Sequence, residues 1–292
     1  MKYKVAHATI YEYSQTVPLC HNEVHLTPRE HHWQLCTVHR ISIRPLPTCL
    51  EHVRDYFGNH SQFFTIQEGH RKLSVTAVSK IEVSAPPVID PGTTPRWTNV
   101  RNQLAERETP FNLDALQFLY DSPQIVITPD LREYAAPSFE PERTWLAAVS
   151  DLMTRIHRDF KYDSTATTIS TPLQEVLKLR RGVCQDFAHL MIGCLRSVGL
   201  SARYVSGYLL TRPPEGKPRL VGSDASHAWV SAWCPGIGWL DFDPTNNCQP
   251  SVEHITLAWG REYSDVCPIK GVFIGGGHHQ MSVSVDVQPI EH

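Results

Sequence analysis

The spacing of apolar residues changes near residue 85, and this change limits the folds that the chain can adopt. Before residue 85, apolar and polar residues alternate, which is typical of half-buried β-strands. The alternating segments are rich in β-branched and aromatic residues and cover 3–11, 37–44, 62–66 and 73–83. Strands of this length, separated by Pro45-Leu46-Pro47 and Gly58-Asn59, predict an antiparallel β-sandwich in a domain at 1–85.

After residue 85 the pattern indicates a linker and then a region with helices. Residues 86–111 are rich in proline, threonine and polar residues, so we expect a linker there. Apolar residues then recur three and four positions apart, most clearly over 142–160, and a short helix is expected over 173–179. The predicted fold class is α+β, with the C-terminal strands assigned to a second domain at 112–292.

The overall composition excludes several classes of function. The chain has 27 Lys and Arg residues against 30 Asp and Glu residues and no run of like charge, so we expect no binding to nucleic acid or membrane. No apolar stretch is long enough to span a bilayer, and the first residues lack the apolar run of a signal peptide. We therefore expect a soluble, cytoplasmic protein whose eight cysteines are mostly reduced. No Cys-x-x-Cys pair occurs, and we expect neither a metal nor a cofactor.

A cysteine lies where a helix is expected to begin, in the segment Arg181-Gly182-Val183-Cys184-Gln185-Asp186-Phe187. Helical spacing continues to Leu195, and Gly199 is expected to follow the end of the helix. The first turn of a helix offers unpaired N–H groups and a partial positive charge, which favour a thiolate and can stabilise an oxyanion. Cys184 is therefore a candidate nucleophile. The alternative is a buried, inert cysteine, which is our interpretation of Cys194.

A histidine and an acid come from two β-like segments, 229–233 and 239–242, which a Gly- and Pro-containing loop joins into a predicted hairpin. If the loop has an odd number of residues, Asp243 lies opposite or diagonal to His227 on one face, within reach of a hydrogen bond. Such an acid would fix the imidazole tautomer, as in a catalytic triad. An even loop would place the two on opposite faces. Asp241 is the alternative acid, and a structural histidine beside a turn-forming aspartate is the alternative without catalysis.

These segments resemble the core motifs of the transglutaminase-like superfamily, relatives of papain-type thiol enzymes. The motifs are Cys184-Gln185-Asp186-Phe187-Ala188, His227-Ala228-Trp229-Val230, and Gly238-Trp239 followed by Asp243-Pro244-Thr245-Asn246. Segments outside this core, such as Asp55-Tyr56-Phe57-Gly58-Asn59 and Gly260-Arg261-Glu262-Tyr263, resemble the β-rich N-terminal region and the tail of many bacterial members. The resemblance covers nearly the whole chain.

The resemblance implies a papain-like core in which a helix that bears the cysteine packs on an antiparallel sheet that bears the histidine and the aspartate. It implies Cys184 as the nucleophile, His227 as the base and then the acid, and Asp243 as the residue that orients His227. Two further residues are interpreted from their positions alone: Tyr162 as a candidate second donor to the oxyanion, and His189 as structural. The segment His21-Asn22-Glu23-Val24-His25 resembles a metalloprotease motif only superficially, because its glutamate is misplaced.

The resulting hypothesis is a thiol-dependent acyl-transfer enzyme that acts on peptide or glutamine carboxamide bonds through a thioester. We favour a hydrolase, that is a cysteine protease or amidase, over a crosslinking protein-glutamine gamma-glutamyltransferase, since no amine-binding acids are evident. A non-catalytic protein-binding module is the alternative from another class. The expected partner is a peptide or protein substrate.

Overall fold

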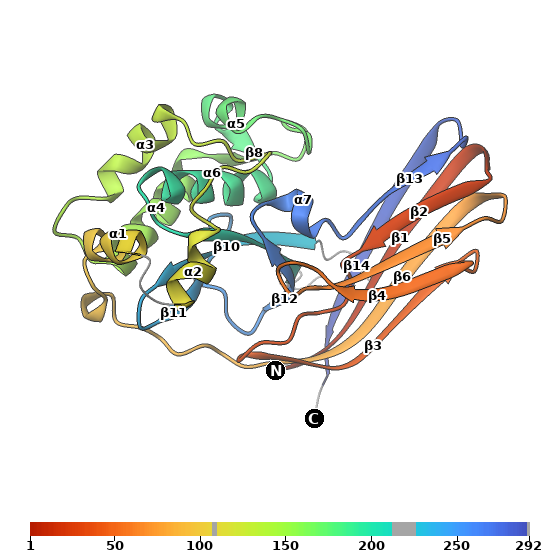
Figure 1. Cartoon of the computed structure of the whole chain (residues 1–292), viewed down its shortest axis with the longest axis horizontal. Coiled ribbons are helices and arrows are strands. Elements are labelled where there is room, and N and C mark those ends of the chain that lie inside the picture. The colour runs from red at the N-terminus through yellow and green to blue at the C-terminus, as the bar shows by residue number, and fades with distance from the viewer. Residues whose placement is uncertain (107–109, 212–225, 291–292) are drawn as a thin grey trace, which may run out of the picture.

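The computed structural model describes residues 1–106, 110–211 and 226–290. Two β-sheets lie face to face at one end of the molecule, and a third sheet with helices packed on it forms the other end (Figure 1). All strand pairs in these three sheets are antiparallel. This architecture confirms the predicted α+β fold class.

The sandwich consists of two four-stranded sheets whose strands follow the alternating segments of the sequence. One sheet has the order β14-β1-β6-β3 and the other β13-β2-β5-β4. Their bounds are β1 Lys2–Val17, β2 Leu19–Val24, β3 Gln34–Arg44, β4 Cys49–Arg54, β5 His60–Ile66, β6 His70–Val83, β13 Ile269–Ile274 and β14 His279–Pro289. Burial along β1 alternates because successive side chains point to opposite faces. Buried side chains from both sheets, among them Val17, Phe64 and Leu73, form an apolar core of their own.

The last two strands of the chain complete the sandwich. β14 pairs with β1 from Tyr3↔Pro289 to Tyr13↔His279, and β13 pairs with β2 over its whole length. Figure 1 shows both strands, in blue, among the red and orange strands of the N-terminal region. The domain division predicted from the sequence grouped these strands with 112–292, and the structure differs at this point. The edges of β1 and β2 carry N–H and C=O groups that need partners, and a strand distant in sequence supplies them.

The segment predicted as a linker contains helical structure. It includes η1 Pro91–Thr93 and α1 Trp97–Glu106, while 107–109 lie outside the described residues. Only three side chains of α1 are buried, Trp97, Val100 and Leu104, and the flanking prolines conceal this weak helical pattern. The linker prediction therefore differs from the structure over α1.

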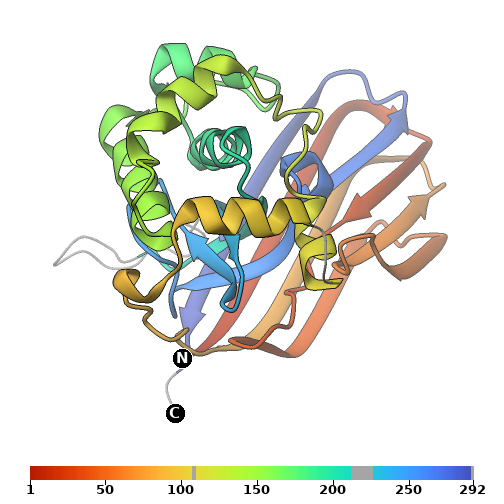
Figure 2. The ribbon, with the colours of Figure 1, turned by 60° about the vertical axis from the view of Figure 1, so that its left-hand side comes forward.

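The core consists of one antiparallel sheet, of order β11-β10-β9-β12, and the helices around it. Its strands are β9 Ala202–Leu209, β10 Ser226–Cys234, β11 Gly238–Phe242 and β12 His254–Gly260. Besides α1, the helical elements of the core are α2 Pro110–Leu116, α3 Pro129–Ala135, η2 Ala136–Ser138, α4 Trp145–Asp159, α5 Leu173–Leu179, α6 Cys184–Ser197 and α7 Tyr263–Val266. Helix α6 packs on β9 and β10, and α3, α4 and α5 pack against it (Figure 2). The helices predicted near 142–160, at 173–179 and after residue 183 are confirmed.

A short pair of parallel strands lies next to the N-terminus of α6. β7, Lys161–Tyr162, runs beside β8, Arg181–Gly182, and brings Tyr162 close to the turn that leads into the helix. Gly199, with φ of +83°, follows the end of α6 as predicted. Within the described ranges, the helices are too short or too polar to cross a bilayer. The cytoplasmic location stays a prediction.

A stack of tryptophan and arginine side chains joins the sandwich to the core. The guanidinium carbon of Arg203, on β9, lies 4.1 Å from the ring centroid of Trp239 and 3.7 Å from that of Trp259. Arg29, which follows β2, lies 3.5 Å from the centroid of Trp259. Asn59 accepts from Arg29 at 2.7 Å and exchanges hydrogen bonds with the Trp259 backbone. Cation–π contacts of this kind contribute about 0.5–2 kcal/mol each, so the stack stabilises the position of the core sheet against the sandwich.

Candidate active site

Cys184 is the first residue of α6 and lies partly exposed at the helix N-terminus. Asp186 holds the turn in front of it, since its Oδ2 accepts hydrogen bonds from the Val183 N–H (2.8 Å) and the Thr167 hydroxyl (2.7 Å). Gly182 permits this arrangement, because a Cβ at that position would collide with the Asp186 carboxylate. The turn therefore presents the thiol of Cys184 beside N–H groups that have no partner within the helix. These groups and the helix dipole favour a thiolate.

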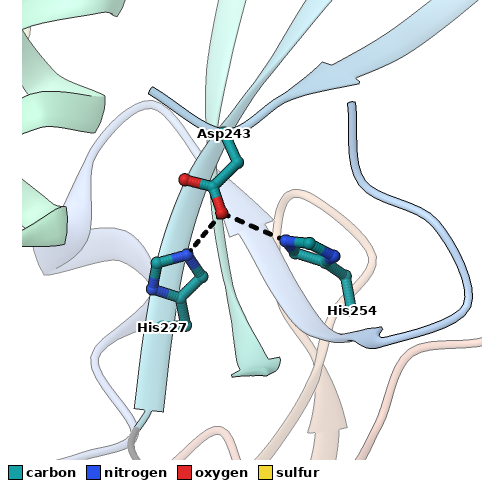
Figure 3. Close-up of side chains that lie close together, drawn as sticks. All are labelled: His227, Asp243 and His254. Carbon is teal, nitrogen blue, oxygen red and sulfur yellow. Dashed lines mark hydrogen bonds and ion pairs between the residues drawn. The ribbon is translucent and has the colours of Figure 1, made fainter. Parts of the chain in front are cut away.

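His227 and Asp243 come from the hairpin of β10 and β11. Val230 pairs with Phe242, and the loop between the paired strands consists of the three residues 235–237. This odd length confirms the register on which the prediction depended. Asp243 directly follows β11 and lies diagonal to His227, with its Oδ2 2.7 Å from His227 Nε2 (Figure 3).

The carboxylate of Asp243 is fully buried and surrounded by hydrogen-bond donors. Its Oδ1 accepts from the backbone N–H groups of Thr245 (2.9 Å) and Asn246 (3.1 Å). Its Oδ2 accepts from the Asn246 side-chain amide at 2.7 Å and from Nε2 of His254 at 3.1 Å, in addition to His227. Five hydrogen bonds to one carboxylate stabilise its ionised form.

These contacts shift the pKa values of the pair in opposite directions. Burial would lower the pKa of His227, but hydrogen bonds with Asp243 and Cys184, and the charges of both, raise it from 6.5 to about 10. Burial would raise the pKa of Asp243, but its hydrogen bonds with His227, His254 and Asn246 hold it far below its usual range. The imidazole is therefore protonated and the carboxylate ionised at neutral pH. Through its interaction with Cys184, His227 links the helix N-terminus to Asp243, so the structure brings the three predicted site residues together.

His254 is a site residue that the sequence analysis missed. It lies on β12, and β9 separates β12 from β10 in the sheet. Its buried ring contacts the ring of Trp229 edge to face, with centroids 5.3 Å apart. With 16 histidines in the chain, no local pattern distinguishes this one. Only the strand order places it beside Asp243.

The alternative acid and the candidate oxyanion donor also have defined places. Asp241 accepts a hydrogen bond from the Trp229 indole at 2.9 Å, whereas His227 is paired with Asp243. Tyr162 is largely exposed and pairs with Gly182 in the turn that leads to Cys184, and burial and the charge of Cys184 raise its pKa. Asp241 therefore supports Trp229 rather than the imidazole, and Tyr162 stays a candidate for the oxyanion.

His189 has the surroundings of a structural residue. It is buried in α6, and its Nε2 accepts a hydrogen bond from the Tyr263 N–H at 3.1 Å. Burial, with a smaller contribution from Arg196, lowers the pKa of His189 to about 3. A histidine that stays neutral and bonds to backbone in this way connects α6 to α7.

Among the described residues, one group of side chains has the composition of a metal site. His227, Asp243 and His254 offer two imidazole nitrogens and a carboxylate oxygen that all lie within 4.8 Å of one another. These are ligands that suit Zn²⁺, but two ligands of a tetrahedral zinc at about 2.0–2.1 Å each lie roughly 3.3 Å apart. The nitrogen–oxygen separations of 2.7 and 3.1 Å are instead hydrogen-bond distances. The group is therefore a hydrogen-bonded cluster.

The fold and the site together define a class of α+β proteins in which a cysteine at a helix N-terminus lies beside a histidine–aspartate pair on an antiparallel sheet. Within this class, the chain belongs to the transglutaminase-like superfamily. Residues 132–244 match the model of the transglutaminase-like superfamily, and residues 3–82 match that of the bacterial transglutaminase-like N-terminal region. The resemblance inferred from the motifs is thereby confirmed, and it supports an enzyme at the level of the family.

Relatives extend over the whole chain. An uncharacterized protein of Mycobacterium tuberculosis is 44% identical over 297 residues, which cover 99% of this chain and 93% of that protein. An uncharacterized protein of Mycobacterium leprae is 30% identical over 288 residues, which cover 97% of this chain and 97% of that protein. A protein-glutamine gamma-glutamyltransferase of Pseudomonas aeruginosa is 42% identical over 72 residues, 24% of this chain and 11% of that protein.

A solved structure shares the complete architecture. It comes from Cytophaga hutchinsonii, is described as "a Putative Cysteine Protease", and has a TM-score of 0.77 at 19% identity. The match covers 100% of this chain and 92% of that one. At this identity the likeness shows the fold alone, and the fold that it shows includes both the sandwich and the core.

Proposed function

We propose that the chain is a thiol-dependent acyl-transfer enzyme that hydrolyses peptide bonds or glutamine carboxamides. The observation that carries the proposal is the interaction of one imidazole, that of His227, with Cys184 and with Asp243. The match to the superfamily core, which spans all three residues, supports it. A nucleophile, a base and an acid that orients the base are what covalent acyl transfer needs.

In the resting enzyme, the proton of the thiol resides on the imidazole. The raised pKa of His227 keeps the ring protonated, and the N-terminus of α6 stabilises the thiolate of Cys184. The His227 Nε2–H donates to Asp243, and Nδ1 points away from that carboxylate (Figure 3). Nδ1 is therefore the nitrogen that exchanges the proton with sulfur and substrate.

Acylation begins when the thiolate attacks the carbonyl carbon, so that a C–S bond forms and the C=O electron pair moves to oxygen. The N–H of Cys184 stabilises this oxyanion, and Tyr162 is the candidate for a second donor. As the C–N bond breaks, His227 gives its proton to the nitrogen. Ammonia or an amine leaves, and a thioester remains.

Deacylation repeats these steps with water. Neutral His227 takes a proton from water as its oxygen attacks the thioester carbon, and a second oxyanion forms. Breaking of the C–S bond releases the carboxylic product and returns Cys184 as a thiolate beside a protonated imidazole. Asp243 stabilises the imidazolium throughout and stays ionised.

A primary amine in place of water would give an isopeptide bond, which is the second candidate function. The similarity over 72 residues to a protein-glutamine gamma-glutamyltransferase of Pseudomonas aeruginosa favours this candidate. We favour hydrolysis because an amine competes with water only where the site excludes water, and Cys184 is partly exposed.

The test is mass spectrometry of a glutamine-containing peptide library after incubation with enzyme and a labelled primary amine. We expect cleaved or deamidated peptides from the wild type and from Cys49→Ala, which removes an exposed thiol on β4, and none from Cys184→Ala. Amine-tagged glutamines would establish the transferase instead. Turnover by Cys184→Ala would overturn the assignment of the nucleophile.

Alkylation gives a second readout that needs no substrate. An ordinary thiol, with a pKa of about 8.5, is less than about 1% ionised at pH 6. We expect iodoacetamide to label Cys184 rapidly at pH 6, and much more slowly in His227→Ala, because the imidazolium that stabilises the thiolate is lost. Uniform labelling of all cysteines, without turnover of any peptide, would favour the protein-binding module.

A further inference from the structure

We propose that His254 is a positioning residue, which holds Asp243 in the orientation that Asp243 needs to hold His227. The inference rests on the proposed function, because it concerns how the same site is kept in its working geometry. It adds a fourth side chain to the three that the motifs indicate.

The first argument is the sharing of one oxygen atom by two imidazoles. Asp243 Oδ2 is 2.7 Å from Nε2 of His227 and 3.1 Å from Nε2 of His254, as the two dashed lines in Figure 3 show. An ionised carboxylate only accepts, so each Nε2 carries a proton and donates it. Within residues 1–106, 110–211 and 226–290, the buried Nδ1 of His254 has no hydrogen-bond partner. Among these residues, the one polar contact of the ring is its bond to Asp243.

The second argument is the direction from which His254 reaches the carboxylate. The other donors come from β10, through His227, and from the turn after β11, through Thr245 and Asn246. His254 comes from β12, on the far side of β9. Without it, Asp243 would be held only by its own turn and by the ring that it must orient.

The third argument is that the sheet is built to let this contact form. Gly207 of β9 pairs with His227 on one side and with Thr256 of β12 on the other. A Cβ at Gly207 would collide with the Trp229 ring and with a β12 carbonyl. The absence of a side chain there lets Trp229 lie over β9, where its ring supports the His254 ring edge to face.

A pair of variants separates the hydrogen bond from the ring. His254→Phe keeps an aromatic ring against Trp229 but lacks the donor, whereas His254→Gln lacks the ring but carries an amide that can donate to Asp243. His70→Phe, which replaces a buried histidine of the sandwich, is the matched control. We expect His254→Phe to lower kcat by about 10- to 100-fold with little change in KM, the range for loss of a hydrogen bond to a charged group. We expect His254→Gln to recover most of that loss.

The pH profile of Cys184 alkylation supplies a readout that a merely structural role would not move. The hydrogen bond from His254 lowers the pKa of Asp243, so its loss raises that pKa and lets Asp243 become protonated at a higher pH. His227 then loses its ionised partner. We therefore expect the fall in the rate of Cys184 alkylation at acidic pH, its acid limb, to begin at a higher pH in His254→Phe but not in His254→Gln. Cys248 also titrates near Asp243, but burial and the Asp243 charge raise its pKa to about 11, away from this limb.

Two results would overturn the positioning role while Cys184→Ala stays inactive. One is an equal loss of kcat in His254→Phe and His254→Gln. The other is wild-type kinetics in His254→Phe together with an unchanged pH profile of Cys184 alkylation. If Cys184 of the wild type is not activated and the wild type turns over no peptide, the proposed function is overturned, and this inference with it.

If His254→Phe does not fold, ¹⁵N NMR of histidine-labelled wild type decides. The proposal requires that Nε2 of His254 is protonated and that Nδ1 is unprotonated, and the opposite tautomer would overturn it.

Discussion

Two buried charged groups lie in the core sheet, Arg203 on β9 and Asp243 at the end of β11, and the protein stabilises them in different ways. Arg203 is on β9 opposite Ser231 of β10, four residues from the point where β9 passes His227. Its guanidinium contacts two tryptophan rings, and the charge of Asp241 also favours its cationic form. Asp243 instead accepts five hydrogen bonds, two of them from imidazoles.

The difference shows which of the two regions is suited to chemistry. The π faces around Arg203 stabilise a fixed cation and exchange no protons, so this region can only hold parts of the fold together. The groups around Asp243 include a histidine whose pKa the site itself controls, and that histidine interacts with a thiol. Two regions of one sheet thus provide a structural link and a proton-transfer site.

The largest expected effect breaks the proton-transfer site and leaves the structural link intact. Asp243→Asn should lower kcat by about 10³- to 10⁴-fold, because a neutral amide no longer fixes the tautomer of His227 or stabilises its charge. Arg203→Met is the control from the same sheet and should keep a rate close to that of the wild type. Steady-state kinetics of both variants check this, and a wild-type rate in Asp243→Asn would remove Asp243 from the triad.

The converse experiment breaks the structural link. Trp259→Leu removes the ring that contacts both Arg203 and Arg29, and it should lower the free energy of unfolding by about 2–4 kcal/mol. The kcat of the molecules that remain folded should not change. Urea denaturation measures the loss against Trp33→Leu, which replaces an exposed tryptophan. A strong fall in kcat at unchanged stability would show that the two regions are not separate.

A smaller effect concerns the pH dependence of stability. The pKa of His227 is about 10 in the folded protein, against 6.5 for the unfolded chain. The folded state therefore binds the proton more tightly, and the resulting stabilisation is complete below about pH 6.5 and is lost as the pH rises through 10. The difference in unfolding free energy between wild type and His227→Gln should shrink from pH 6 to pH 10. A difference that is independent of pH would contradict the raised pKa.

The comparison also shows which parts of the site a sequence can reveal. Cys184 lies at a helix boundary, and the positions of His227 and Asp243 follow from the parity of one short loop, so local patterns suffice for these three residues. The place of His254 depends on β12 pairing with β9, where His254 lies opposite Leu209. Pairing between distant strands leaves no local pattern.

The same reason explains what could not be predicted of the fold. The strands of the sandwich follow from their alternation, which is a local property. That β13 and β14 complete its two sheets is a pairing across more than 200 residues of sequence, as in Tyr3↔Pro289. Helix α1 was missed because its few buried positions follow a proline-rich stretch.

The smallest expected effect is that of a chelator, which tests whether the cluster of His227, Asp243 and His254 works through hydrogen bonds. EDTA should leave the turnover and the unfolding free energy of the wild type unchanged, because the nitrogen–oxygen distances of 2.7 and 3.1 Å already pair the groups with one another. Added Zn²⁺ should inhibit, and more strongly at higher pH, since it must displace the protons that both Nε2 atoms donate. Loss of turnover in EDTA that zinc restores would show the opposite, that these three side chains need a metal to work.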